Sequence, residues 1–367
     1  MIKAVILFIV GLVLLIKGGD WFVDGATGIA ERFHVPELII GATVVSIGTT
    51  LPEVMVSANS ALSGHGEMAY GNALGSIICN TALIAAITVA VKPGKVDRKT
   101  LRVPVAFFFT AMLIYAFGAY IRGSFERPLG LILLCAFAVY MVILVQQALA
   151  QMKLAGAEGD SNKLNVGGTD SRDIIIEEKS ERDNTGDVEK ASENDVKNEK
   201  KEKSKKENPL WKDILLLVFG AALIAEGADL LVDNGTIIAQ AMGVPESVIA
   251  LTFIALGTSL PELVTAITSL AKGHGALSLG NVCGANLFNL VLVSGLSISL
   301  SPFGLPSGKT VNIGGNIANA SLVIDLPLAT LVMVILTIPA LIKGELKRWQ
   351  GISLLAMYAG FCAFQFM

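Results

Sequence analysis

The sequence repeats itself at a fixed offset of 209 residues, and this repeat constrains the fold more than any other feature. Residues 36–80 align with residues 245–289 without a gap, and 17 of the 45 aligned positions are identical. The identities include the short segments Gly-Thr, Leu-Pro-Glu, Gly-His-Gly and Gly-Asn. A chain with such a repeat is expected to fold into two halves that share one architecture.

Both halves are strongly apolar. Of the 367 residues, 53% are hydrophobic and only 16% are charged, and the mean hydropathy is +0.64. An ordinary soluble domain carries roughly 25% charged residues. This composition argues against a soluble enzyme, a nucleic-acid-binding protein and a disordered protein, and it indicates a protein of the lipid bilayer.

Ten stretches are long and apolar enough to cross a bilayer, which takes roughly 20 residues per helix. They lie at residues 2–18, 37–62, 68–91, 100–121, 128–151, 212–237, 246–271, 276–300, 318–341 and 347–366. We therefore predict an all-α membrane protein with five helices in residues 1–151 and five in residues 210–367. Because five is odd, the second repeat must be inverted, as in many secondary transporters that bind their substrate between the halves.

The two halves are joined by a hydrophilic linker, residues 152–209. Residues 153–207 carry 15 acidic and 12 basic side chains, and the linker has no aromatic residue. Such a segment cannot bury enough apolar surface to order itself, so we predict that it is mostly disordered. Lysine and arginine in the short loops number 11 on one side and 4 on the other. The positive-inside rule then predicts an inner or plasma membrane protein with both termini outside and a cytoplasmic linker.

Two glutamates, Glu53 and Glu262, stand at equivalent positions in the middle of predicted spans. A carboxyl group at the centre of a bilayer costs a few kcal/mol or more, so such a residue indicates a functional site. The alternative is a structural ion pair with a basic residue of another span. No span offers Lys or Arg at a comparable depth, which favours the functional interpretation.

Each glutamate follows a proline, Pro52 or Pro261. Proline removes a backbone donor and clashes with the carbonyl one turn earlier, so carbonyl groups near Thr49 and Thr258 are expected to be free. Within a bilayer, free carbonyls are tolerated only where they line a cavity or bind an ion. A plain proline kink is common in membrane helices, but two kinks that each precede a buried glutamate favour an ion site.

Amide and hydroxyl side chains follow in the next span of each half. Ser76 and Asn80 are one helical turn apart and share a face, and Asn289 corresponds to Asn80 in the second half. We expect Asn80 and Asn289 to belong to the ion site. Asn72 and Asn281 fit two roles equally well, gating of the ion path and hydrogen bonding between packed helices.

These side chains and carbonyls form a set of oxygen ligands, which suits Ca²⁺ and can also serve Na⁺. The sequence contains no nucleotide-binding loop and no H-E-x-x-H or G-x-S-x-G motif. We therefore expect a transporter that uses no nucleotide and no cofactor, rather than an enzyme. Its partners would be its transported ions and the lipid bilayer, with no nucleic acid, and a monomer could suffice.

The paired segments GTTLPE…GNALGSIICN and GTSLPE…GNVCGANLFN resemble the two α-repeats of the cation/calcium antiporter superfamily, in particular its prokaryotic sodium/calcium exchangers. The resemblance covers both membrane blocks. It implies exchange of Na⁺ for Ca²⁺ by alternating access, with net export of calcium and movement of charge. It implies that Glu53 and Glu262 bind calcium with the carbonyls of Thr49 and Thr258. It assigns sodium to both glutamates and to Ser46, Thr50, Ser76, Asn80, Ala255, Ser259 and Asn289, with Ser46 and Ala255 contributing carbonyls.

The chain departs from the pattern of this superfamily at two positions. The second half has Ala285 where the first has Ser76, so one hydroxyl ligand is missing. It has Asn289 where potassium-dependent relatives carry aspartate, which argues against potassium co-transport. Two other functions remain open. A Ca²⁺/H⁺ antiporter would load protons onto the same two glutamates, and a passive cation channel would conduct without a counter-ion.

Overall fold

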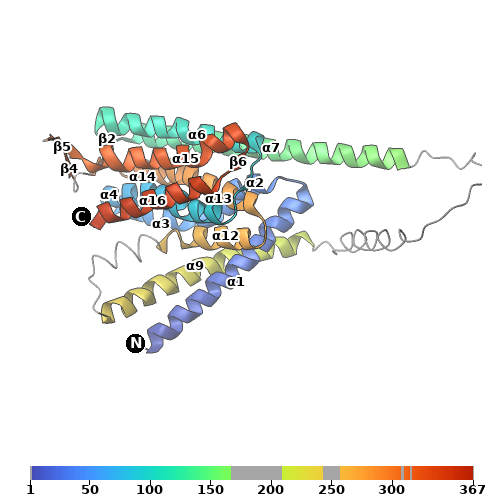
Figure 1. Ribbon diagram of the computed structural model, residues 1–367, viewed down its shortest axis with the longest axis horizontal. Coiled ribbons are helices and arrows are strands. Elements are labelled where there is room, and N and C mark those ends of the chain that lie inside the picture. Colours follow the sequence, from blue (N-terminus) through green and yellow to red (C-terminus); the bar gives the residue numbers. More distant parts are fainter. Residues whose placement is uncertain (1, 167–208, 243–256, 307–309, 315, 367) are drawn as a thin grey trace, which may run out of the picture.

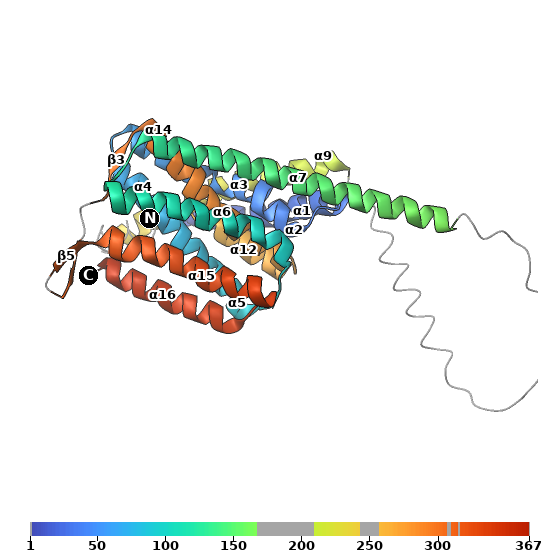
Figure 2. The same cartoon turned by 90° about the horizontal axis from the view of Figure 1, so that it is seen from above.

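The computed structural model describes residues 2–166, 209–242, 257–306, 310–314 and 316–366, which form a bundle composed mostly of helices (Figures 1 and 2). Among these residues, eight helical stretches are long and apolar enough to cross a membrane. They are Ile2–Phe33, Glu37–Leu62, Gly66–Val91, Arg98–Arg122, Arg127–Met152, Leu210–Gly235, Gly275–Leu300 and Ser321–Lys343. The molecule is therefore a multi-pass membrane protein.

The helices follow the order of the predicted spans in both halves. The first half contains α1 (Ile2–Phe33), α2 (Glu37–Ile40), η1 (Gly41–Val45), α3 (Ser46–Leu62), α4 (Gly66–Cys79), η2 (Asn80–Ala85), α5 (Ala86–Val91), α6 (Arg98–Phe117), η3 (Gly118–Arg122) and α7 (Arg127–Val166). The second contains α9 (Leu210–Ala241), α12 (Leu260–Ala271), α13 (Gly275–Phe288), η5 (Asn289–Val293), α14 (Ser294–Leu300), η6 (Ser321–Asp325), α15 (Leu326–Lys343) and α16 (Arg348–Phe366). Elements named η are π-helical turns.

Two predicted spans lie outside the group of eight. The span at 246–271 is described only from residue 257, and its helix α12 is a shorter apolar helix. The span at 347–366 corresponds to α16, a helix of 19 residues. The linker, predicted at 152–209, lies mostly outside the described residues. The count of ten spans therefore stays a prediction.

The predicted end of the first span near residue 18 is wrong. Helix α1 continues without interruption through Lys17, Asp20 and Asp24 to Phe33. The charged residues that suggested a turn are accommodated because Asp20 and Asp24 form ion pairs with Lys272 of the second half. Tertiary contacts thus override the local charge pattern. Helix α7 also runs beyond its predicted end at 151 and extends past the rest of the bundle (Figures 1 and 2).

Helices α1 and α9 cross along one side of the bundle in antiparallel directions, and glycines bring their backbones together (Figure 1). A Cβ added at Gly11 would lie 2.9 Å from the carbonyl oxygen of Gly227, and one added at Gly18 would lie 2.9 Å from that of Gly220. Glycines of this kind allow the close van der Waals packing that stabilises helix pairs in lipid. The 209-residue offset relates Gly11 to Gly220 and Gly18 to Gly227, so the crossing uses the same positions of both halves.

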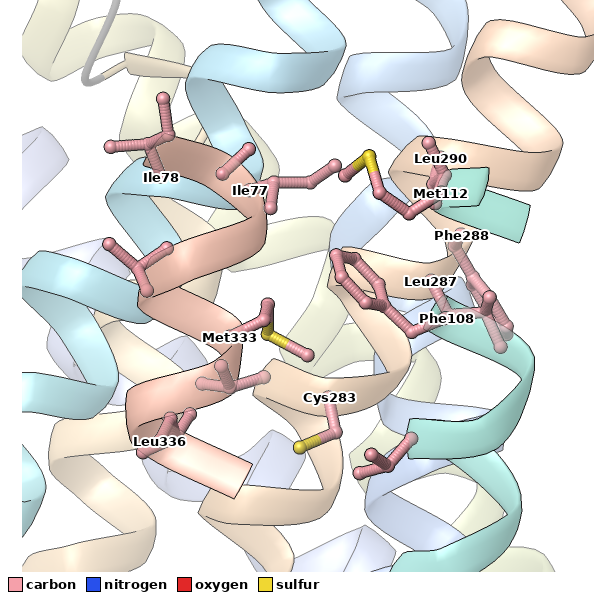
Figure 3. Close-up of a cluster of buried hydrophobic side chains, with 14 of the residues drawn as sticks. Ile77, Ile78, Phe108, Met112, Cys283, Leu287, Phe288, Leu290, Met333 and Leu336 are labelled. Carbon is pink, nitrogen blue, oxygen red and sulfur yellow. The ribbon is translucent and has the colours of Figure 1, made fainter. Parts of the chain in front are cut away.

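The hydrophobic core lies between helices of both halves. Figure 3 shows side chains of α4, α6, α13 and α15 packed against one another, among them Ile77, Phe108, Leu287 and Met333. None of these four side chains exposes more than 1% of its surface. The core therefore holds α4 and α13 in place, and the asparagines predicted to bind ions, Asn80 and Asn289, directly follow these two helices at the starts of η2 and η5.

Six short strands, which an all-α prediction does not include, form three two-stranded sheets. β1 (Gly94–Lys95) pairs with β6 (Glu345–Leu346), β2 (Ser124–Phe125) with β3 (Phe303–Gly304), and β4 (Thr310–Ile313) with β5 (Asn316–Asn319), all antiparallel. The first two sheets each join a loop of one half to a loop of the other. Pairing across chain segments distant in sequence leaves no local pattern, which explains why these strands were not predicted.

Candidate ion-binding site

The two predicted glutamates are fully buried. Glu53 lies in α3 and Glu262 in the first turn of α12, and neither side chain is exposed to solvent. The prolines before them act differently. Pro52 lies inside α3, which stays helical around it, whereas Pro261 lies in the first turn of α12, whose N-cap is Ser259. The helix break predicted near Thr258 is thus present in the second half, while the first half remains helical.

The buried polar atoms around these glutamates lack partners. Both carboxylate oxygens of Glu53 and of Glu262 have no hydrogen-bond partner in the described part of the chain. The same holds for the hydroxyls of Thr50 and Ser259 and for the side-chain amide of Asn80. The amide of Asn289 is likewise buried and without a partner. Buried polar groups are nearly always satisfied, so such a set of unpartnered oxygens indicates a ligand.

The negative charges of Glu53 and Glu262 also interact with each other. Two buried carboxylates that repel one another are unfavourable unless cations or protons neutralise them. Among the described residues, no ion pair reaches either glutamate. The site therefore has the charge and the ligand chemistry to accept a cation.

Of the hydrogen bonds that join the halves at this site, two correspond to each other under the repeat. The Thr49 hydroxyl donates to Oδ1 of Asn281 at 3.3 Å, and the Thr258 hydroxyl donates to Oδ1 of Asn72 at 3.3 Å. Each asparagine thus orients a threonine of the opposite half. Both Asn72 and Asn281 therefore form hydrogen bonds between helices, which is one of the two roles predicted for them.

The two asparagines are supported unequally. The Asn72 amide nitrogen donates to the Ser57 hydroxyl at 2.8 Å and to the Glu53 carbonyl at 3.3 Å. The amide nitrogen of Asn281 is buried without a partner in the described residues. The residue that corresponds to Ser57 in the second half is Ala266, which offers no acceptor. The Asn281 amide nitrogen therefore lacks both of the hydrogen bonds that the Asn72 amide nitrogen makes.

The remaining predicted ligands are buried nearby, with one exception. The Ser46 hydroxyl donates to the carbonyls of Gly41 at 2.8 Å and Asn281 at 3.0 Å. Its side chain is thereby occupied, as expected if only its carbonyl faces an ion. Ser76 is 4% exposed. Ala255 lies outside the described residues.

Three π-helical turns border the site, and the sequence did not predict them. η1 ends immediately before Ser46, η2 begins at Asn80, and η5 begins at Asn289. π-helical turns are rare and occur frequently at functional sites, because an extra residue per turn shifts neighbouring side chains and carbonyls. Their hydrogen bonds leave no signature in hydrophobic periodicity. The occurrence of one turn beside each of these three residues supports their assignment to the site.

A cavity of about 550 Å³ adjoins this region. It reaches Thr49 and Pro52 of α3, and Thr258 and Pro261 near α12. Its opposite wall is α9, which contributes Asp229 and Asp233. The described residues contain no cluster of three or more His, Cys, Asp or Glu side chains that could hold a resident metal ion.

Membrane-spanning helices around a buried, accessible set of oxygen ligands define a cation transporter. The chain matches the family described as sodium/calcium exchanger protein over residues 3–146 and 212–367. It belongs to this family, whose members transport ions rather than catalyse reactions. The match supports the class of cation/calcium antiporters.

Relatives and solved structures agree with this assignment. An uncharacterized membrane protein of Methanocaldococcus jannaschii is 30% identical over 360 residues, which cover 96% of this chain and 94% of the relative. The sodium/calcium exchanger MaX1 of Methanosarcina acetivorans is 31% identical over 379 residues, covering 97% and 96%. A structure of the sodium-calcium exchanger NCX_Mj soaked with Na⁺ and Sr²⁺ superimposes with a TM-score of 0.72 at 26% identity, covering 99% of this chain and 98% of that one.

Proposed function

We propose that this protein exchanges Na⁺ for Ca²⁺ across the membrane by alternating access. One observation carries this proposal, namely the set of buried oxygens without partners on Glu53, Glu262, Thr50, Ser259 and the two asparagines Asn80 and Asn289. Oxygen ligands of this kind suit calcium and sodium. The MaX1 relative is named a sodium/calcium exchanger, which supports the same pair of ions.

We assign one calcium ion to Glu53 and Glu262 with the carbonyls of Thr49 and Thr258. Two carboxylates balance the divalent charge, and the carbonyls complete the coordination without adding charge. In this assignment Asn72 and Asn281 act indirectly. By accepting hydrogen bonds from Thr258 and Thr49, they fix the turns that present those carbonyls.

Sodium ions use the same glutamates with ligands around them. The proposed set is Ser46, Thr50, Ser76 and Asn80 in the first half, and Ala255, Ser259 and Asn289 in the second. The competition of both ions for Glu53 and Glu262 supplies the coupling, because the two carboxylates cannot cross the membrane uncompensated.

The proposed exchange moves net charge. If three Na⁺ exchange for one Ca²⁺, a tenfold sodium gradient supplies roughly 4 kcal/mol and a potential of 100 mV adds roughly 2.3 kcal/mol. Together they sustain a calcium gradient of order 10⁴–10⁵. Such an exchanger extrudes calcium under ordinary gradients.

We further propose that the halves are inverted five-helix repeats, residues 1–151 and 210–367, joined by the linker at 152–209. The antiparallel crossing of α1 and α9 through equivalent glycines supports this arrangement. In the orientation favoured by the positive-inside rule, both termini are outside and the linker is cytoplasmic. An inverted pair with its site between the halves is suited to alternating access.

Calcium uptake into proteoliposomes tests the function. Vesicles loaded with Na⁺ are diluted into sodium-free medium, and uptake of ⁴⁵Ca²⁺ is compared with vesicles loaded with K⁺ or held under a proton gradient. We expect uptake only with the outward sodium gradient, and faster uptake when the interior is positive. Uptake driven by a pH gradient without sodium would instead establish Ca²⁺/H⁺ antiport. Calcium flux without any counter-ion gradient would indicate a channel.

A further inference from the structure

At one end of the bundle, α1 rests directly on α12. A Cβ added at Gly19 would lie 2.6 Å from Cγ1 of Val264 and 2.9 Å from Oγ1 of Thr268. The absence of a side chain at Gly19 is therefore what lets α1 approach α12 so closely. The two helices are therefore in direct contact at this end of α12.

Ion pairs also join α1 to the end of α12 here. Lys272 directly follows α12, and its Nζ lies 2.8 Å from Oδ1 of Asp24 and 3.5 Å from Oδ1 of Asp20 in α1. The ammonium also donates a hydrogen bond to the Asp20 carbonyl at 2.9 Å. One side chain thus makes three contacts from the end of α12 to α1. We call Gly19, Asp20, Asp24, Val264, Thr268 and Lys272 the latch.

The offset of 209 residues gives each latch residue a counterpart at the other end. The counterparts on α9 are Ala228, Asp229 and Asp233, and those at α3 are Met55, Asn59 and Ser63. These counterpart residues do not form the contacts seen in the latch. Met55, the counterpart of Val264, is 69% exposed and lines the 550 Å³ cavity together with Asp229 and Asp233.

Two sequence differences explain why only one end closes. Ser63 replaces the lysine, so the carboxylates of α9 face no ammonium from the end of α3; within the described residues neither Asp229 nor Asp233 forms an ion pair. Ala228 replaces the glycine and carries the methyl group that would clash in the packing seen at Gly19. Both differences act in the same direction.

We propose that the latch biases the transporter toward the conformation that is closed at the Lys272 end and open at the Ser63 end. Both glutamates and the ion ligands lie outside the latch, so it sets which side the site faces rather than what the site binds. The proposal rests on alternating access as proposed above. In the orientation proposed there, the Lys272 end is cytoplasmic, so the resting protein faces the outside.

The exposure of the charged side chains determines how far the latch shifts the equilibrium between the two conformations. The Lys272 and Asp24 side chains are 27% and 54% exposed, so water weakens their attraction. Ion pairs of this type change an equilibrium by roughly two- to fivefold. A latch of this strength leaves the other conformation populated, as a transport cycle requires.

Thiol labelling at two corresponding positions measures the bias. Val264→Cys reports opening at the Lys272 end, and Met55→Cys reports opening at the Ser63 end. Each reporter is placed in the full-length protein in proteoliposomes and treated with a water-soluble maleimide without any ion gradient. Peptide mass spectrometry reads the labelled fraction at the reporter, so the four native cysteines can remain.

Lys272→Ser copies Ser63, and Gly19→Ala copies Ala228. Lys272→Ser is expected to speed labelling of Val264→Cys by roughly two- to fivefold, and both substitutions are expected to slow labelling of Met55→Cys. Gly19→Ala is read at Met55→Cys alone, because the Val264→Cys reporter removes the Cγ1 atom that the added methyl group would meet. Lys272→Arg keeps the charge and should leave both rates unchanged. Ser63→Lys adds a latch at the other end, so it should slow labelling of Met55→Cys.

Opposite changes at the two reporters distinguish a conformational shift from loss of structure. If Lys272→Ser left both labelling rates at their original values and Gly19→Ala did not change the rate at Met55→Cys, the latch proposal would be wrong. A parallel rise at both reporters would also overturn it, because Lys272 would then support the fold rather than one conformation. Labelling requires no calcium flux. A failure of sodium/calcium exchange and a failure of the latch are therefore separate results.

Discussion

The two halves share the buried glutamates and the hydrogen bonds beside them, and they differ in the hydroxyl and packing residues around this centre. Glu53 and Glu262 are equally buried, and the hydrogen bonds Thr49–Asn281 and Thr258–Asn72 have the same length of 3.3 Å. Around this shared centre, the hydroxyls of Ser57 and Ser76 in the first half are replaced by methyl groups in the second. The repeat thus conserves the charges that any calcium site needs, while hydroxyls and packing residues vary between the halves.

The largest effect is expected where the halves are alike. Glu53→Gln and Glu262→Gln should each reduce sodium-dependent calcium uptake at least roughly 100-fold, because a neutral amide leaves a divalent ion uncompensated in a desolvated site. Glu126→Gln, which alters an exposed ion pair with Arg122, is the control and should transport normally. Near-normal uptake by either buried variant would show that the two halves do not share the calcium ion.

The glycines where α1 crosses α9 offer a second test of whether the two halves are equivalent. Gly18→Ala and Gly227→Ala occupy corresponding positions, and each added methyl meets backbone of the opposite helix within 2.9 Å. Both should destabilise the protein by about 1–3 kcal/mol through overpacking. Thermal unfolding in detergent measures this loss. Gly360→Ala in α16, where no described atom lies within 4 Å of the added Cβ, should leave the unfolding temperature nearly unchanged.

The unequal support of the two asparagines predicts a smaller effect. Ser57→Ala removes the 2.8 Å hydrogen bond from Asn72 and should raise the half-saturating calcium concentration about fivefold, since such a bond contributes about 1 kcal/mol. Ala266→Ser gives Asn281 the partner that it lacks and should lower that concentration. Calcium dependence of uptake at fixed sodium distinguishes the two. If both variants had the same half-saturating calcium concentration, these hydrogen bonds would have no effect on the calcium ligands.

The smallest effect concerns sodium alone. Ala285→Ser restores the hydroxyl that Ser76 provides in the first half, so the half-maximal sodium concentration should fall roughly two- to fivefold. Calcium affinity should stay nearly unchanged, because neither residue belongs to the proposed calcium ligands. Ser76→Ala is the matched reverse change and should raise the sodium requirement. If sodium dependence did not respond to Ala285→Ser, position 285 would not face the ion path.

Much of the architecture could be predicted because it depends on periodic, local properties. Apolar stretches of sufficient length predicted the eight described spans, and the mid-span position of Glu53 and Glu262 predicted their burial. Local rules failed at α1, where charges at Lys17 and Asp20 suggested a turn but the helix continues to Phe33. They also failed at the π-helical turns and the short strands, whose hydrogen bonds depend on packing or on distant segments.

The sequence by itself determined the membrane class, the two-fold repeat and the residues that carry charge and oxygen ligands. These follow from composition, spacing and the energetic cost of a carboxylate in lipid, which depend on residue type alone. Only the tertiary structure decided how the halves face each other. It paired Thr49 with Asn281 across 232 positions of sequence, and it set Lys272 against Asp24 while leaving the counterpart Asp233 at the wall of a cavity. Such contacts form between side chains that no local pattern connects, so their energies appear only once the chain has folded.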